Sequence, residues 1–176
     1  MPIIDLLDFL FIILYIDYMN EKDLNRTIVK SIKKIGWAHK ISDDAGNFTG
    51  TSQKPFDYFG VTKNFIIYGE SKFIKGIYSF NFKRLEDHQI EALSSIYRES
   101  GNHADYVLPL VSVGFWEPHK YLYILFFHIL TITNFIEEDK ISLKKKEIQS
   151  FIDKGKFLSV KKGEVQNVET IPDIVI

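Results

Sequence analysis

The chain carries two acidic residues and a lysine whose types and spacing suit metal-assisted hydrolysis. Segment 65–72 reads as an apolar strand that ends in Glu70, Ser71 and Lys72. Alternate residues of a strand point to the same face, so the side chains of Glu70 and Lys72 should lie next to each other. Asp57 lies upstream on the neighbouring arm of a predicted hairpin, and its carboxylate could reach the same place.

This arrangement points to the chemistry of phosphodiester hydrolysis. Carboxylate oxygens are ligands that suit Mg²⁺ or Mn²⁺. Such an ion lowers the pKa of a bound water and stabilises the negative charge that develops on a phosphate, while a nearby lysine orients the water or neutralises the phosphate. On spacing alone, however, a surface ion pair is the commoner explanation of Glu70 and Lys72, because 26% of the residues are charged.

A longer series of motifs extends the pattern in both directions. It consists of Glu21-Lys22-Asp23-Leu24-Asn25, Asp57-Tyr58-Phe59-Gly60-Val61, Glu70-Ser71-Lys72, Asn81-Phe82 and Asp87-His88-Gln89-Ile90-Glu91. The series resembles that of the RecU-type Holliday-junction resolvases, which belong to the PD-(D/E)xK nuclease superfamily. In that family an Asp-Tyr-x-Gly-Val segment is followed at the same interval by Glu-Ala-Lys, and then by a helix with His-Gln-Ile-Glu. The resemblance covers residues 20–97.

The resemblance implies a fold, a metal and a set of site residues. The implied fold is a single α/β domain with a restriction-endonuclease-like mixed sheet flanked by helices, and the implied cofactor is Mg²⁺, with Mn²⁺ as the alternative. The residues that it assigns to catalysis are Asp57, Glu70, Lys72, Glu21 and Gln89. Asp57 and Glu70 would be metal ligands, the carbonyl of Ser71 would be a third ligand, and Lys72 would be the catalytic lysine.

Two of these assignments have an ordinary structural alternative. By the resemblance Glu21 is an accessory acid, but an acid in the first turn of a helix is also favoured by the helix dipole. Gln89 would support the site from its helix, yet Gln89 and His88 could equally be polar groups on a helix surface.

The chain departs from the family in three places. The family usually carries a long insertion before the catalytic aspartate, which forms a stalk associated with the four-way junction, whereas only residues 42–54 stand there in this chain. The short segment bears on selectivity for junctions more than on phosphodiester cleavage. Ser71 replaces the usual alanine, and its side chain should face away from the metal. Residues 1–19 have no counterpart in the family.

Composition limits what the chain can be. Its 176 residues, 45% of them hydrophobic, suffice for one compact domain with a buried core. The 22 basic and 23 acidic residues nearly cancel, so a DNA-binding surface must come from local segregation of charge. The absence of cysteine excludes disulfides, thiolate metal sites and cysteine nucleophiles.

Hydrophobic periodicity predicts helices alternating with strands. The predicted helices cover residues 21–34, 86–97 and 142–154, with Asn20 and Ser142 as the caps of the first and the last. The predicted strands cover residues 37–41, 56–61, 64–72, 106–115 and 121–132. This order implies a mixed sheet flanked by helices.

Basic residues on two predicted helices are candidates for binding DNA. They are Lys22, Arg26, Lys30, Lys33, Lys34, Lys144, Lys145 and Lys146. Stripes of this kind suit a row of phosphates, although they also occur as solvated helix faces. Trp37, Trp116 and the fifteen phenylalanines fit a core better than platforms for stacking bases.

The chain divides into an apolar start (1–19), a nuclease domain (20–160) and a C-terminal tail (161–176). The unbroken apolar run 9–16 is only eight residues long, Asp5, Asp8 and Asp17 punctuate the wider segment 3–19, and no basic residue precedes the run. A membrane span needs a longer apolar run, and a signal peptide needs a basic residue before its apolar run. We therefore expect an interface or packing element, no membrane partner and a cytoplasmic protein.

The first hypothesis for function is an Mg²⁺-dependent, structure-selective endonuclease, a Holliday-junction resolvase in DNA recombination and repair. A homodimer is expected because cutting a junction in paired strands needs two symmetric sites. The second hypothesis is a phage or restriction-type nuclease that cuts duplex DNA with the same site. The third is a catalytically silent DNA-binding accessory protein, and substrate preference and activity separate the three.

Overall fold

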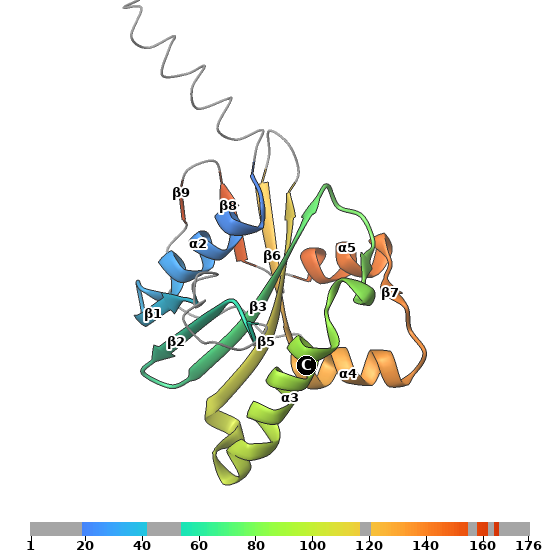
Figure 1. Ribbon diagram of the computed structural model, residues 1–176. Coiled ribbons are helices and arrows are strands. Elements are labelled where there is room, and N and C mark those ends of the chain that lie inside the picture. The colour runs from blue at the N-terminus through green and yellow to red at the C-terminus, as the bar shows by residue number, and fades with distance from the viewer. Residues whose placement is uncertain (1–18, 42–53, 117–120, 155–157, 162–163, 166–176) are drawn as a thin grey trace, which may run out of the picture.

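One mixed sheet of seven strands positions the segments that carry the motifs (Figure 1). The computed structural model describes residues 19–41, 54–116, 121–154, 158–161 and 164–165. The strands lie in the order β1-β2-β3-β5-β6-β8-β9. Neighbouring strands are antiparallel except for β3 and β5, which are parallel. The predicted mixed sheet flanked by helices is confirmed.

The elements have the following bounds. The strands of the main sheet are β1 (Gly36–Lys40), β2 (Tyr58–Thr62), β3 (Ile66–Lys75), β5 (Val107–Trp116), β6 (Tyr121–His128), β8 (Leu158–Lys161) and β9 (Glu164–Val165). A second, two-stranded sheet consists of β4 (Phe80–Asn81) and β7 (Ser142–Leu143). The helices are α2 (Glu21–Ile32), α3 (Asp87–Ser100), α4 (Ile129–Glu137) and α5 (Lys145–Asp153), with 3-10 turns η1 (Phe82–Arg84) and η2 (Gly101–Tyr106).

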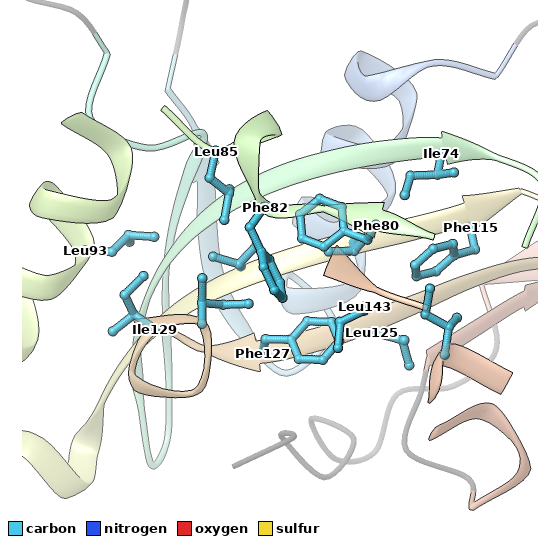
Figure 2. Close-up of a cluster of buried hydrophobic side chains, with 14 of the residues drawn as sticks. Ile74, Phe80, Phe82, Leu85, Leu93, Phe115, Leu125, Phe127, Ile129 and Leu143 are labelled. Carbon is cyan, nitrogen blue, oxygen red and sulfur yellow. The ribbon is translucent and has the colours of Figure 1, made fainter. Parts of the chain in front are cut away.

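Helices cover both faces of the sheet and define two hydrophobic cores. On one face, α2 packs on alternate residues of β5 and β6, including Leu110 and Ile124. On the other face, α3, α4 and α5 pack on the intervening residues, including Val113 and Phe127, together with β4 and η1 (Figure 2). All ten residues of β5 are buried, as expected for a central strand with both faces covered.

A side-chain cap fixes the start of α2 and thereby the position of its first turn. Asn20 accepts hydrogen bonds from the backbone of Lys22 (2.8 Å) and Asp23 (3.3 Å), and Asp23 accepts one in return from the backbone of Asn20 (3.2 Å). The predicted cap is confirmed, and the reciprocal bonds form a capping box. Glu21, the first residue of the helix, is held in place as a result.

The prediction of one strand over 121–132 was wrong in its last four residues. The strand β6 ends at His128, and α4 begins at Ile129. The side chain of His128 accepts a hydrogen bond from the backbone of Leu130 (3.3 Å) and so caps the helix. Aromatic and β-branched residues continue across this boundary, which is why the strand pattern concealed it.

The predicted cap of the last helix was also wrong. Ser142 lies in β7, paired with Asn81, and the helix α5 begins at Lys145. The backbone of Lys144 donates to the carboxylate of Glu147 (2.8 Å) at the helix start. Because β7 continues directly into the helix, a serine close to the helix start is not its cap.

Regular structure continues past the predicted domain boundary at residue 160. The strand β8 ends at Lys161, and β9 follows at Glu164–Val165. The apolar start (1–18), most of the stalk position (42–53) and the end of the tail (166–176) lie outside the described residues. Within the described part of the chain, no helix is both long and apolar enough to cross a membrane.

A close contact between Gly69 and Tyr58 sets how tightly β2 and β3 pack. The buried ring of Tyr58 lies over Gly69, where an added Cβ would stand 1.9 Å from the ring carbon Cζ. The hydroxyl of Tyr58 continues across the sheet to Ser112 Oγ, at 2.5 Å. Gly69 therefore permits the contact that holds the hairpin against β5.

We predict that Gly69→Ala destabilises the protein by about 1–3 kcal/mol, because the new methyl group overpacks a buried site. Denaturant unfolding of Gly69→Ala and Tyr58→Ala, singly and together, measures this. The cost of Gly69→Ala should shrink when Tyr58 is already alanine. Equal costs in both backgrounds would show that the ring of Tyr58 is not what excludes a side chain at position 69.

Candidate active site

The site lies where β3 continues beyond its partner β2. Pairing between the two strands stops at Tyr58 and Gly69, whereas β3 runs on to Lys75 beside β5. From residue 70 onward, β3 is therefore paired with a strand on one edge, while its other edge must find different hydrogen-bond partners.

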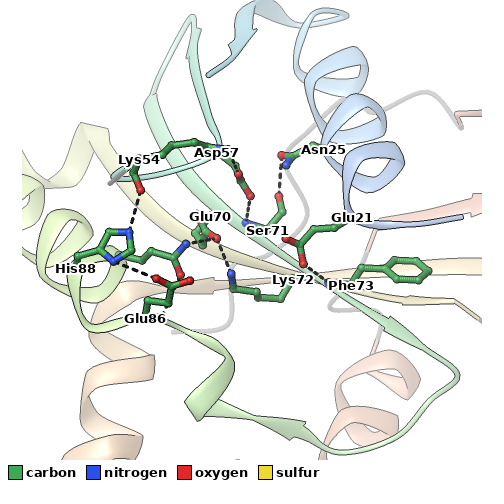
Figure 3. Close-up of polar contacts among 11 residues, drawn as sticks. Glu21, Asn25, Lys54, Asp57, Glu70, Ser71, Lys72, Phe73, Glu86 and His88 are labelled. Atoms are coloured by element: carbon green, nitrogen blue, oxygen red, sulfur yellow. Dashed lines mark hydrogen bonds and ion pairs between the residues drawn. The ribbon is translucent and has the colours of Figure 1, made fainter. Parts of the chain in front are cut away.

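Two carboxylates bond to this edge of β3. The backbone N–H of Ser71 donates to Asp57 Oδ2 (2.9 Å), and that of Phe73 donates to Glu21 Oε2 (3.3 Å) (Figure 3). The N–H and C=O groups of one residue in an extended strand point to the same edge. The carbonyl of Ser71 is therefore on the edge that Asp57 and Glu21 approach.

The side chain of Glu70 is buried between Lys72 and α3. Its Oε1 accepts hydrogen bonds from Lys72 Nζ (2.8 Å) and Gln89 Nε2 (2.7 Å). The side-chain oxygen Oε1 of Gln89 accepts a hydrogen bond from the backbone N–H of Glu86 at the start of α3 (3.1 Å). Glu70 Oε2 is also buried, and it has no hydrogen-bond partner among the residues that the structure describes.

Burial makes the charge of Glu70 unfavourable. The side chain is only 2% exposed, and loss of hydration, reinforced by the nearby carboxylate of Asp57, raises the pKa of Glu70 to about 7. The hydrogen bond and positive charge of Lys72 act in the opposite direction but do not cancel this effect. Near neutral pH, Glu70 is therefore present in both its charged and its protonated form.

Two residues that sequence reasoning missed hold this arrangement in place. Asn25, one helical turn after Glu21, is buried and accepts a hydrogen bond from Ser71 Oγ at 3.0 Å. Lys54 forms an ion pair with Asp57 Oδ1, and its carbonyl is 3.1 Å from His88 Nε2. A polar residue on the apolar stripe of a helix was a usable signal for Asn25, whereas no pattern pointed to Lys54.

The donor set fits a hard divalent cation. Mg²⁺ is usually held through one or two carboxylates and keeps several waters, so Asp57, Glu70 and the Ser71 carbonyl would be sufficient. A buried carboxylate oxygen without a partner, as in Glu70, is costly unless a cation or water bonds to it. The described residues contain no group of three or more acids, histidines or cysteines placed to hold an ion. The candidate donor set remains the two carboxylates and the carbonyl of the prediction.

The structure brings the predicted catalytic residues together but divides the predicted basic surface. Asp57, Glu70, Lys72 and Gln89 meet around β3, and Glu21 reaches its edge. The basic residues Lys22, Arg26, Lys30, Lys33, Lys34, Lys144, Lys145 and Lys146 are all exposed. However, α2 and α5 lie on opposite faces of the sheet, so their lysines do not form one surface (Figure 1).

Comparison with known proteins gives likenesses among solved structures alone. No family model and no curated protein matches the sequence. Among solved structures, Hjc of Archaeoglobus fulgidus, described as a Holliday junction resolvase from an archaeal hyperthermophile, superposes with a TM-score of 0.45 at 17% identity. The match covers 72% of this chain and 89% of that protein. A likeness at this level assigns neither a family nor an activity, and the RecU type stays a prediction.

The buried position of Glu70 predicts a specific dependence of stability on pH. Because its pKa is about 7 in the folded protein against 4.5 for the free group, folding retains a proton that the unfolded chain releases. Stability is then lost as pH rises through 7. The free energy of unfolding of Glu70→Gln, relative to that of the natural protein, should therefore rise by roughly 2–3 kcal/mol as the pH is raised from about 5 to about 8.

Urea unfolding in the presence of a chelator measures this difference. The control is Glu91→Gln, since Arg98 lowers the pKa of that exposed carboxyl and leaves it charged in both states over the same range. The difference in unfolding free energy between Glu91→Gln and the natural protein should not change with pH. A flat difference for Glu70→Gln as well would contradict a raised pKa at Glu70.

Proposed function

We propose that this protein is a metal-dependent endonuclease that hydrolyses DNA phosphodiesters. The observation that carries the proposal is Glu70, a buried carboxylate that is oriented by Lys72 and Gln89 and has one oxygen left without a partner. A structural ion pair would need neither the burial nor the nearby carboxylate of Asp57. The ordered motifs of the sequence support the same function.

Each residue of the site has a distinct role in the proposal. Asp57, Glu70 and the Ser71 carbonyl would hold Mg²⁺, or Mn²⁺ in its place, and the bound ion would supply a water of lowered pKa and positive charge beside the phosphate. Lys72, already within hydrogen-bond distance of Glu70, would donate to that water or to a phosphate oxygen. Gln89 fixes the orientation of Glu70.

Residues of α2 act on the site by binding to β3. Asn25 bonds to the side chain of Ser71, and Glu21 bonds to the backbone of Phe73. They hold the strand in register with the helix, and this fixes the direction of the Ser71 carbonyl. Glu21 is also a further acid bound to that edge, which supports its role as an accessory acid.

The substrate that we propose is branched DNA, with the protein acting as a homodimeric Holliday-junction resolvase in recombination and repair. The motif series supports this choice, and two symmetric sites suit paired cuts. A nuclease for duplex DNA with the same site is the second candidate, favoured by the short segment 42–54 in place of a stalk. The intact set of Asp57, Glu70 and Lys72 argues against a catalytically silent protein.

Cleavage assays on a labelled four-way junction, the matched duplex and single strands, with and without Mg²⁺, test the function. The junction should be cut in a metal-dependent reaction. Asp57→Asn and Glu70→Gln should each abolish cleavage while binding stays the same or tightens, because each removes negative charge that faces phosphate. Near-full cleavage by either variant would refute the metal site, and equal cleavage of junction and duplex would favour the second candidate.

Lys72→Ala should lose most of the single-turnover rate with a smaller effect on metal binding, since the lysine is not a ligand. The rate should be measured at about pH 8.5, because removal of Lys72 also removes a charge that lowers the pKa of Glu70. Lys75→Ala, an exposed lysine at the end of the same strand, is the matched control. An unchanged rate in Lys72→Ala would make the lysine structural.

A further inference from the structure

The β1–β2 end of the sheet has a face that no described helix covers. The α2 side of these strands is buried, as Ala38 and Tyr58 show. On the opposite side, which α3 covers farther along the sheet, Trp37 is 56% exposed, Val61 39% and Ile66 37%. The expectation that Trp37 belongs to the core was therefore wrong. We call the side formed by Trp37, His39, Phe59, Val61, Ile66 and Tyr68 the aromatic face.

Ring contacts join the aromatic face into one surface. The ring of Trp37 stacks on His39, with centroids 6.2 Å apart, and meets the edge of Phe59 at 5.8 Å. Phe59 in turn lies 5.0 Å from Tyr68, which packs against Phe56 at 5.3 Å. Trp37 is thus held at its base while most of its own surface stays open to solvent.

Strand register makes this face continuous with the proposed active site. Trp37 pairs with Val61, which pairs with Ile66, and His39, Phe59 and Tyr68 form the next row. Glu70 follows Tyr68 at the next position on the same face of β3. The row of Trp37 is therefore about 13 Å along the strands from the row of Glu70, a span of a few nucleotides.

The charged residues of the described segments that form the aromatic face are positive. Segments 33–41 and 58–69 contain four lysines and no acidic residue. Lys33 and Lys34 lie in the turn between α2 and β1, and Lys63 lies in the turn between β2 and β3. Asp105 precedes β5, on the far side of β3 from Trp37. Aromatic rings beside lysines are the combination that binds single strands, since bases stack and phosphates pair with cations.

We propose that the aromatic face binds unpaired nucleotides of the DNA substrate, with a base stacked on Trp37. The proposal rests on the nuclease function above and deepens it, because it places unpaired DNA beside the scissile phosphate. A second copy of this chain suits the face less well. A twofold interface would bring the two lysine borders together, and like charges repel.

Binding of oligothymidylate by the full chain in a chelator tests the proposal without any cleavage. Trp37→Ala should weaken binding about tenfold, whereas Trp37→Phe should bind nearly as the natural protein does. An oligomer of the same length without bases separates stacking from charge. Both the natural protein and Trp37→Ala should bind that oligomer equally weakly. Tyr78→Ala, an aromatic residue that is 63% exposed beyond β3, is the matched control.

Tryptophan emission gives a second measurement, because Trp116 is buried and Trp37 is the exposed one of the two tryptophans. Oligothymidylate should quench the natural protein and not Trp37→Phe. The proposal would be overturned by any of three results: undiminished binding by Trp37→Ala, absence of quenching in the natural protein, or sedimentation showing that Trp37→Ala breaks a dimer. Loss of binding in Trp37→Ala with no nuclease activity in the natural protein would instead count against the nuclease function alone.

Discussion

The rest of the site depends on the burial of Glu70. A carboxylate that is 2% exposed can keep its charge only if neighbouring groups compensate for lost hydration, and Lys72 and Gln89 both bond to the same oxygen. Loss of hydration, reinforced by the nearby carboxylate of Asp57, still raises the pKa of Glu70, and its second oxygen has no partner among the described residues. Compensation is therefore incomplete in the protein alone, and a divalent cation is the kind of group that would complete it.

Features of the fold and the site that depend on residues close together in sequence could be predicted from the sequence, and features that depend on distant residues could not. Asn20 caps α2 through atoms within three residues, and Glu70 and Lys72 share a face by strand geometry alone, so both were predictable. The change from β6 to α4 at His128 was hidden because the apolar pattern is the same on both sides. Ser142 was misread because its pairing with Asn81 is set by a strand distant in sequence.

Long-range contacts account for what was missed at the site. Asn25 meets Ser71 only after α2 has packed on β3, and the carbonyl of Lys54 meets His88 only after α3 has packed beside the hairpin. The exposure of Trp37 depends on where α3 stops covering the sheet, which no local pattern records. Gly69 combines the two cases. The sequence shows directly that position 69 has no side chain, but the reason, the ring of Tyr58 packed over it, is visible only in the folded structure.

The strand β3 is fixed from two sides, and this determines how a substrate could approach. On one side α2 holds Ser71 and Phe73, and on the other α3 holds Glu70 through Gln89. Because α3 occupies the sheet face on the β5 side of Glu70, a phosphate would reach that residue from the uncovered side, across β1 and β2. The route of approach is then the aromatic face itself. The same arrangement that buries Glu70, the proposed metal ligand, would therefore direct the DNA strand over Trp37.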